Sequence, residues 1–177
     1  MEISCYKSEE PGKKEVLLIF ERKELVYDIR NACYVEGHIL TEATDEQRHT
    51  VQDIGEEGNI DIVTRTLDLT HADIVERLYP FTEREIDNPV IIDKLHEKPV
   101  YGIVMRVPEK FSQTTVNLLG KLIHELLVTS TVKEWLKITN PNKAMVWQEK
   151  EEALMKRLLE VRQGRRGRTR IKQHWFN

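Results

Sequence analysis

The chain has 177 residues, a length typical of one domain with room for a short appendage. Cys5 and Cys33 are its only cysteines, which excludes a disulfide framework and favours folding in a reducing compartment. The net charge of −3 conceals an asymmetry. Residues 162–177 hold six of the 27 basic residues and none of the 30 acidic ones, so residues 1–161 carry a net charge of −9. An acidic body with a cationic tail predicts that the tail meets an anionic surface.

The N-terminal region carries no signal for secretion or membrane insertion. Its first five residues include an acid and no base. The longest apolar run there, Val16–Phe20, is far shorter than a signal-peptide core or a membrane span requires. The sequence therefore predicts a protein that is neither secreted by the usual route nor inserted in a membrane.

Two short β segments are expected near the start of the chain. Ile3–Tyr6 and Glu15–Phe20 flank the turn signal Pro11-Gly12, a combination that predicts a small hairpin. Over residues 23–40 the apolar side chains recur at helical spacing and share one face, which predicts an amphipathic helix.

Two further helices are expected next. Thr44 and Gln47 have the spacing of a capping box, which predicts a short helix to about Ile54. Asn59 then caps a longer helix that ends before Pro80 and is the clearest amphipathic helix of the chain. Its apolar stripe consists of Ile60, Val63, Leu67, His71, Ile74 and Leu78.

After this helix the sequence loses its helical period. Residues 81–98 are polar and predict a loop with one short apolar element at Val90–Ile92. Val100–Val107 has the composition of a strand, which ends at Pro108. The sequence leaves open whether the segment 81–107 contacts a neighbouring subunit.

The remainder of the body is expected to be helical. Ser112 caps a long helix that reaches about Ile138, and the middle of this helix is apolar around most of its circumference, which places it at the centre of the core. Asn140 and Pro141 then serve as the N-cap and the first residue of a final helix to about Val161. The chain is thus predicted to be mainly α, with residues 1–161 forming a helical bundle with a small β-hairpin and strand element. Residues 162–177 form an extended basic C-terminal arm.

No pattern in the sequence defines a catalytic or metal site. His124 and Glu125 begin a two-histidine zinc motif, but Val128 stands where the second histidine is required. His71 lies in an apolar stripe, as hydrogen-bonded core or interface histidines do, and Cys33 lies on an apolar face as a small hydrophobe. The glycines form no phosphate-binding loop. The sequence therefore predicts no enzyme, no cofactor and no metal; an enzyme whose site residues are scattered is the weakest alternative.

The remaining candidate site is the C-terminal arm. Its arginines offer fork-shaped donors for phosphate or carboxylate, and its terminal aromatic pair suits a partner's pocket better than water. Three interpretations are open: a solubilising tail, an arm that grips a nucleic-acid backbone, and an arm that docks into another protein subunit. The predicted partner-binding residues are Arg162, Arg165, Arg166, Arg168, Arg170, Lys172, Trp175 and Phe176.

The region from Phe111 onward has a distinctive order of elements. It comprises an apolar helix through His124-Glu125-Leu126-Leu127-Val128 and Trp135-Leu136, a restart at Asn140-Pro141, a second helix through Trp147 to Leu159, and an Arg-rich arm ending in Trp175-Phe176. In this order, which covers somewhat over a third of the chain, it resembles the helical head-to-tail connector (neck or adaptor) proteins of tailed bacteriophages. The resemblance is architectural. It implies an all-α core, a ring beneath the portal, an arm docked on the portal or on a neighbour, and no cofactor.

The leading interpretation is a structural protein of a tailed-phage virion, a head-to-tail connector or adaptor in the neck, made in the bacterial host cytoplasm. The expected partners are further copies in a ring, the portal protein and other neck or tail proteins, without a membrane. An acidic body and a basic arm suit the heterologous contacts of such a ring. The alternative is a nucleic-acid-binding accessory protein that uses the same Arg-rich tail on DNA.

Overall fold

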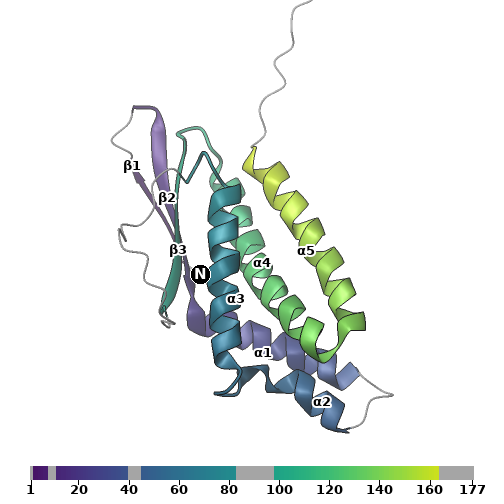
Figure 1. Ribbon diagram of the computed structural model, residues 1–177. Helices are drawn as coiled ribbons and strands as arrows, with labels where there is room; N and C mark the ends of the chain where they lie inside the picture. The colour runs from purple at the N-terminus through teal and green to yellow at the C-terminus, as the bar shows by residue number, and fades with distance from the viewer. Residues whose placement is uncertain (1, 8–10, 40–44, 83–97, 164–177) are drawn as a thin grey trace, which may run out of the picture.

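A computed structural model describes residues 2–7, 11–39, 45–82 and 98–163 (Figure 1). The elements in chain order are β1 (Glu2–Lys7), β2 (Lys13–Glu21), α1 (Arg22–Ile39), α2 (Asp45–Gln52), the 3-10 helix η1 (Asp53–Gly55), α3 (Ile60–Arg77), β3 (Val100–Pro108), α4 (Gln113–Thr139) and α5 (Pro141–Arg162). This architecture confirms the mainly α fold with a small β element. The predicted element at Val90–Ile92, Thr44 of the predicted capping box, and the arm beyond Gln163 lie outside the described residues.

The three strands form one antiparallel sheet in the order β1–β2–β3. Leu18 of the central strand pairs with Ile3 of β1 on one side and with Ile103 of β3 on the other. Alternate side chains of a strand face opposite sides, and one face of β2 and β3 is buried. The buried residues of this face are Val16, Leu18, Phe20, Tyr101, Ile103, Met105 and Val107. The strand expected at Val100–Val107 thus joins the predicted hairpin in a single sheet.

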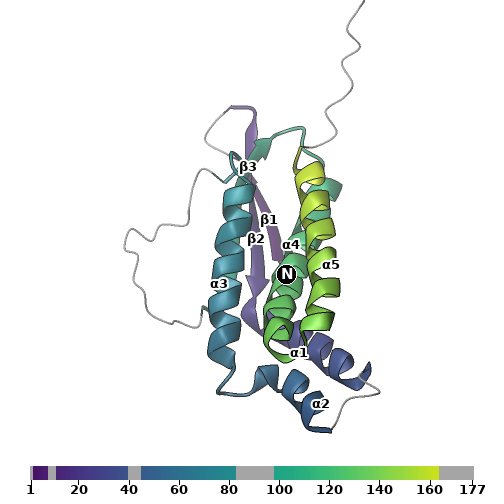
Figure 2. The same cartoon turned by 45° about the vertical axis from the view of Figure 1, so that its right-hand side comes forward.

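Helix α4 is the central element of the core. It contacts α1, α2, α3, α5 and β2. In both views α3 and α4 lie against the sheet, α5 lies alongside α4, and α1 and α2 close one end of the molecule (Figures 1 and 2). Neighbours on most sides of α4 explain why its sequence is apolar around most of its circumference.

Most helix starts follow the sequence signals, but two predicted caps are wrong in mechanism. The side chain of Asn140 accepts a hydrogen bond from the amide three residues on, at 3.3 Å, as its place before a proline predicts. Asn59 has helical backbone torsions, and its side chain donates to the Asp53 carbonyl at 2.9 Å instead of capping α3. Ser112 likewise stands at the N-cap of α4 without a side-chain cap bond.

Candidate functional site

The root of the basic arm is fastened to the body by its first arginine. The Arg162 guanidinium donates to the backbone carbonyl of Arg77, and also to that of Tyr79 at 3.0 Å. These carbonyls lie at the C-terminal end of α3, where a cation is favoured by the helix dipole. Arg162 therefore has acceptors inside its own chain. The other predicted partner-binding residues lie outside the described part of the chain: Arg165, Arg166, Arg168, Arg170, Lys172, Trp175 and Phe176.

Helix α5 ends at Arg162, at the pole of the body opposite to α1 and α2. At the start of α5, Trp147 Nε1 donates to Glu36 Oε1 of α1 at 3.0 Å, and Lys143 Nζ lies 3.2 Å from Glu36 Oε2. At the end of α5, Arg162 reaches the end of α3. Figures 1 and 2 both show the end of α5 and the α1–α2 pair at opposite poles. The two poles of the body therefore differ: one holds α1 and α2, and the other holds Arg162, from which the sequence continues into the basic arm.

The opposite pole carries a surface hollow of about 430 Å³ between α1 and η1, the α1–η1 hollow. Tyr27 and Tyr34 of α1 border it and are 68% and 54% exposed. The Tyr34 ring stacks on His38, with the ring centroids 5.3 Å apart. Asp53 and Glu56 border the hollow from the η1 side.

The floor of this hollow is set by a close contact between α1 and η1. The Arg30 guanidinium donates to the Gly55 carbonyl, and a Cβ atom at Gly55 would collide with the Arg30 side chain. A larger residue at position 55 would therefore displace the Arg30 side chain from this place. The Arg30 side chain is held in the hollow and is oriented by a backbone acceptor.

A second hollow, of about 480 Å³, lies between α3 and β3 and contains His71. His71 Nε2 is 3.0 Å from the Gly102 carbonyl and donates to it. Burial lowers the pKa of His71, and the nearby Lys98 ammonium acts in the same direction. A neutral histidine bonded to a strand carbonyl agrees with the structural role that the sequence favours for His71.

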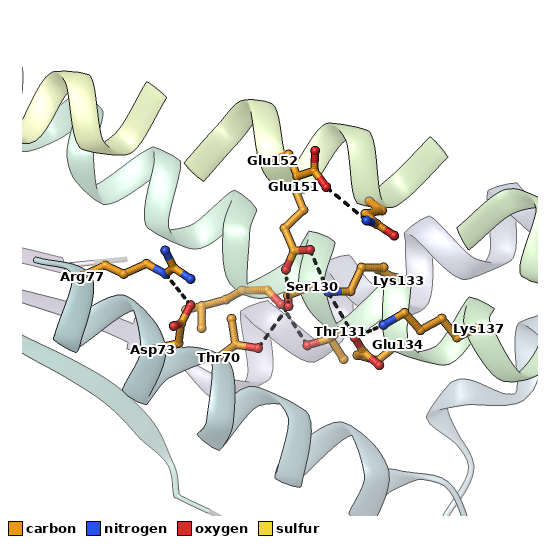
Figure 3. A network of polar contacts seen from close by, with 12 residues as sticks. Thr70, Asp73, Arg77, Ser130, Thr131, Lys133, Glu134, Lys137, Glu151 and Glu152 are labelled. Carbon is orange, nitrogen blue, oxygen red and sulfur yellow. Dashed lines mark hydrogen bonds and ion pairs between the residues drawn. The ribbon is translucent and has the colours of Figure 1, made fainter. Parts of the chain in front are cut away.

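A chain of polar side chains crosses the interface of α3, α4 and α5 (Figure 3). Thr70 Oγ1 donates to Ser130 Oγ at 3.2 Å, and Ser130 Oγ donates to Glu151 Oε1 at 2.7 Å. Lys133 Nζ lies 2.7 Å from Glu151 Oε2 and 3.1 Å from Glu134 Oε1. Side chains from three helices are thus joined through one buried serine.

This polar chain contains the residue types of a nucleophilic site but not its electrostatics. A nucleophilic serine needs a neighbouring base. Burial by itself would lower the pKa of Lys133, but its hydrogen bonds to Glu151 and Glu134 outweigh burial and raise that pKa, so the amine stays protonated. Neither hollow described above is bordered by Ser130. The arrangement is that of a structural link between helices.

His124, which begins the incomplete zinc motif, is engaged with α1. Its Nε2 atom lies 2.7 Å from Asp28 Oδ2, and the pair ties α4 to α1. Across residues 2–7, 11–39, 45–82 and 98–163, no group of three or more His, Cys, Asp or Glu side chains is placed to hold a metal ion. The described residues therefore contain no candidate metal centre.

The two cysteines are expected to differ sharply in reactivity. Burial, with a smaller contribution from Glu36, raises the pKa of the Cys33 thiol to about 12, whereas Cys5 is exposed on β1. A rise of about three pH units leaves ~1000-fold less thiolate at a given pH. With a disulfide reagent at pH 8, one thiol per chain should react within minutes, and the second only on unfolding. Rapid labelling of both thiols in native protein would contradict the burial of Cys33, and a Cys5→Ser variant identifies the fast site.

No family model, no curated protein and no solved structure matches this chain. In the part of the chain that the structure describes, no helix is long and apolar enough to cross a lipid bilayer. The function must therefore be argued from the chain's own residues: the basic arm with its fixed root, and the α1–η1 hollow at the other pole.

Sequence reasoning does not find the α1–η1 hollow, although one signal for it is present. Tyr27 and Tyr34 are two helical turns apart, so they share a face of α1, opposite to the buried face of Leu25 and Ile29. Nothing in the sequence indicates that η1 lies beside that face.

Proposed function

We propose that this chain is a structural subunit of a tailed-phage virion, a head-to-tail connector or adaptor. In this role copies form a ring at the portal, and the C-terminal arm is the docking element. The observation that carries the proposal is a cationic arm whose root is fastened by Arg162 to one pole of a body with a net charge of −9. A fastened root gives the arm a defined direction, which a docking arm needs and a solubilising tail does not.

The resemblance of the region from Phe111 onward supports the same proposal. The helix of that pattern corresponds to α4, which is the centre of the core, and the restart at Asn140 has the expected cap geometry. Rings are built from heterologous contacts, in which one patch meets a different patch of the next copy. An acidic body and a basic arm provide two patches of opposite charge, which favour correct pairing and fast association.

Charge reversal in the arm tests this proposal. Arg165→Glu, Arg166→Glu and Arg168→Glu together should reduce incorporation of a tagged chain into particles from the native source by at least ~10-fold, since a tenfold loss of affinity corresponds to about 1.4 kcal/mol. Incorporation is measured by quantitative mass spectrometry of purified particles. The matched control reverses three exposed cations of the body, Lys121→Glu, Lys156→Glu and Arg157→Glu.

Both triple variants change the net charge equally, so the comparison separates docking through the arm from a general effect of charge. Selective loss of incorporation with the arm variant, at unchanged thermal stability, supports docking through the arm. Normal incorporation of the arm variant would show that the arm does not dock the chain.

A nucleic-acid-binding accessory protein is the second candidate, favoured by the spacing of arginines and aromatics in the arm. It predicts affinity for DNA that falls steeply with salt and disappears in a chain that ends at Gln163. The cut after Gln163 retains Arg162 and its bonds to the end of α3. DNA affinity that is weak, or that persists without the arm, removes this candidate.

A further inference from the structure

We infer that the α1–η1 hollow is the acceptor for the C-terminal arm of a second copy of this chain. The inference rests on the proposed function and makes it more specific, because it names the next copy as the surface that receives the arm. The evidence consists of exposed aromatic side chains, charge complementarity and the reach of the arm.

Two exposed tyrosines make the hollow suitable for arginine side chains. Tyr27 and Tyr34 lie on one face of α1, border the hollow and are each more than half exposed. A guanidinium placed over a tyrosine ring is attracted by the ring quadrupole and keeps its donors free for carboxylates. Tyrosine and arginine are also the residue types that contribute most at protein interfaces.

Asp53 and Glu56 border the same hollow on the η1 side, and two more acidic residues follow them closely in the sequence. Residues 53–61 include Asp53, Glu56, Glu57 and Asp61 and no basic residue. No ion pair between described residues uses these four carboxylates. Arg30 is the cation in the lining, and its guanidinium is already bonded to the Gly55 carbonyl. Residues 164–177 carry five cations and no acid, so arm and hollow are complementary in charge.

The reach of the first two arginines beyond Arg162 distinguishes a second copy from the same chain. Helix α3 runs from the hollow's pole to the arm's root, and its 18 residues span about 27 Å. Arg165 and Arg166 follow Arg162 by three and four residues, so the backbone can carry them at most about 14 Å from that root. These two arginines therefore fall well short of their own hollow, whereas residues from Lys172 onward, ten or more residues beyond Arg162, could span that distance. Arg165 and Arg166 can enter the hollow of a second copy whose α1–η1 pole lies beside the end of α5.

Contacts between opposite poles also define the type of assembly. The arm at one pole and the hollow at the other are different patches, so every copy gives one contact and receives one. Such heterologous contacts close into rings when the rotation between copies permits it. The proposed ring thus needs no additional surface for its copy-to-copy link.

Photo-cross-linking of the full-length chain tests the acceptor. A Gly167→benzoylphenylalanine chain, with the probe next to Arg166, is labelled with ¹⁵N, mixed with unlabelled wild-type chain, irradiated and digested. Peptides that join the ¹⁵N arm to unlabelled residues 22–39 or 53–61 are the expected result. Cross-links within one chain, or to any other surface of the second copy, overturn the inference.

A charge swap supplies the second test. Glu56→Arg with Glu57→Arg should lower the yield of this cross-link at least ~10-fold, and an arm carrying Arg165→Glu and Arg166→Glu should restore it. The matched control is Glu149→Arg with Glu160→Arg, two exposed acids of α5, which should leave the yield unchanged. Absence of rescue overturns the inference.

The two levels of the proposal can fail separately. If the arm cross-links in native particles to a second structural protein such as the portal, and not to the hollow of another copy, the acceptor is wrong and the connector function stands. If the arm cross-links to nucleic acid alone, both the acceptor and the connector function fail.

Discussion

Phe20→Ala is expected to lower the free energy of unfolding by about 3–5 kcal/mol, the range for truncating a buried phenylalanine. Phe20 is fully buried at the end of β2, where the strand pairs with Tyr101 of β3 and runs directly into α1. Its ring centroid lies 6.4 Å from that of His124 on α4. The cavity left by alanine would therefore open between the sheet, α1 and α4. Chemical denaturation followed by circular dichroism measures the loss.

The matched control is Tyr6→Ala, an aromatic truncation in the same sheet. Tyr6 is 59% exposed, and its loss should change the free energy of unfolding by no more than about 0.5 kcal/mol. Domains of this size are stable by about 5–15 kcal/mol, so the Phe20 variant should lose at least about a fifth of the total. A cost below about 1 kcal/mol for Phe20→Ala would mean that the sheet is peripheral to the core.

Local sequence signals predict the strands but not their pairing into one sheet, which is central to the fold. The Pro11-Gly12 turn and the composition of Val100–Val107 are enough to predict the strands. Their union in one sheet depends on pairs such as Leu18 with Ile103, which are separated in the chain by three α-helices and the 3-10 helix η1. Local periodicity carries no information about such long-range pairs, whereas it places α3, α4 and α5 to within a few residues.

The candidate site divides in the same way between local and long-range information. Charge and composition identify the basic arm from the sequence alone, because the arm's property is a sum over adjacent residues. The α1–η1 hollow brings together Tyr27 and Glu56, which no local pattern connects. Carboxylates such as Glu134 and Glu151 likewise look like surface acids in the sequence, and only the packing of α4 against α5 shows that they share Lys133.

The link between α4 and α5 determines where the arm leaves the body, and Lys133→Met tests that link. The substitution leaves the Glu151 carboxylate, whose side chain is 20% exposed, without its ammonium partner at 2.7 Å. Removing one member of a buried pair costs about 3–5 kcal/mol, and the partial exposure of this pair lowers the expected loss of unfolding free energy to about 2–3 kcal/mol. Denaturant unfolding measures it. Lys137→Met, which removes a 50% exposed partner of Glu134, is the control and should cost no more than about 0.5 kcal/mol.

A second substitution distinguishes an unpaired charge from lost packing. Lys133→Met with Glu151→Gln removes both charges but keeps an acceptor for the Ser130 hydroxyl, so most of the lost stability should return. If the double variant is as unstable as Lys133→Met, the loss does not come from an unpaired Glu151 charge, and the interactions of Lys133 itself hold α5 against α4. If stability returns, the cost of Lys133→Met is that of an unpaired carboxylate, and the ion pair adds little net stability. In that case α5 is held mainly by apolar contacts such as those of the buried Leu158, and these contacts set the position of Arg162 at the start of the arm.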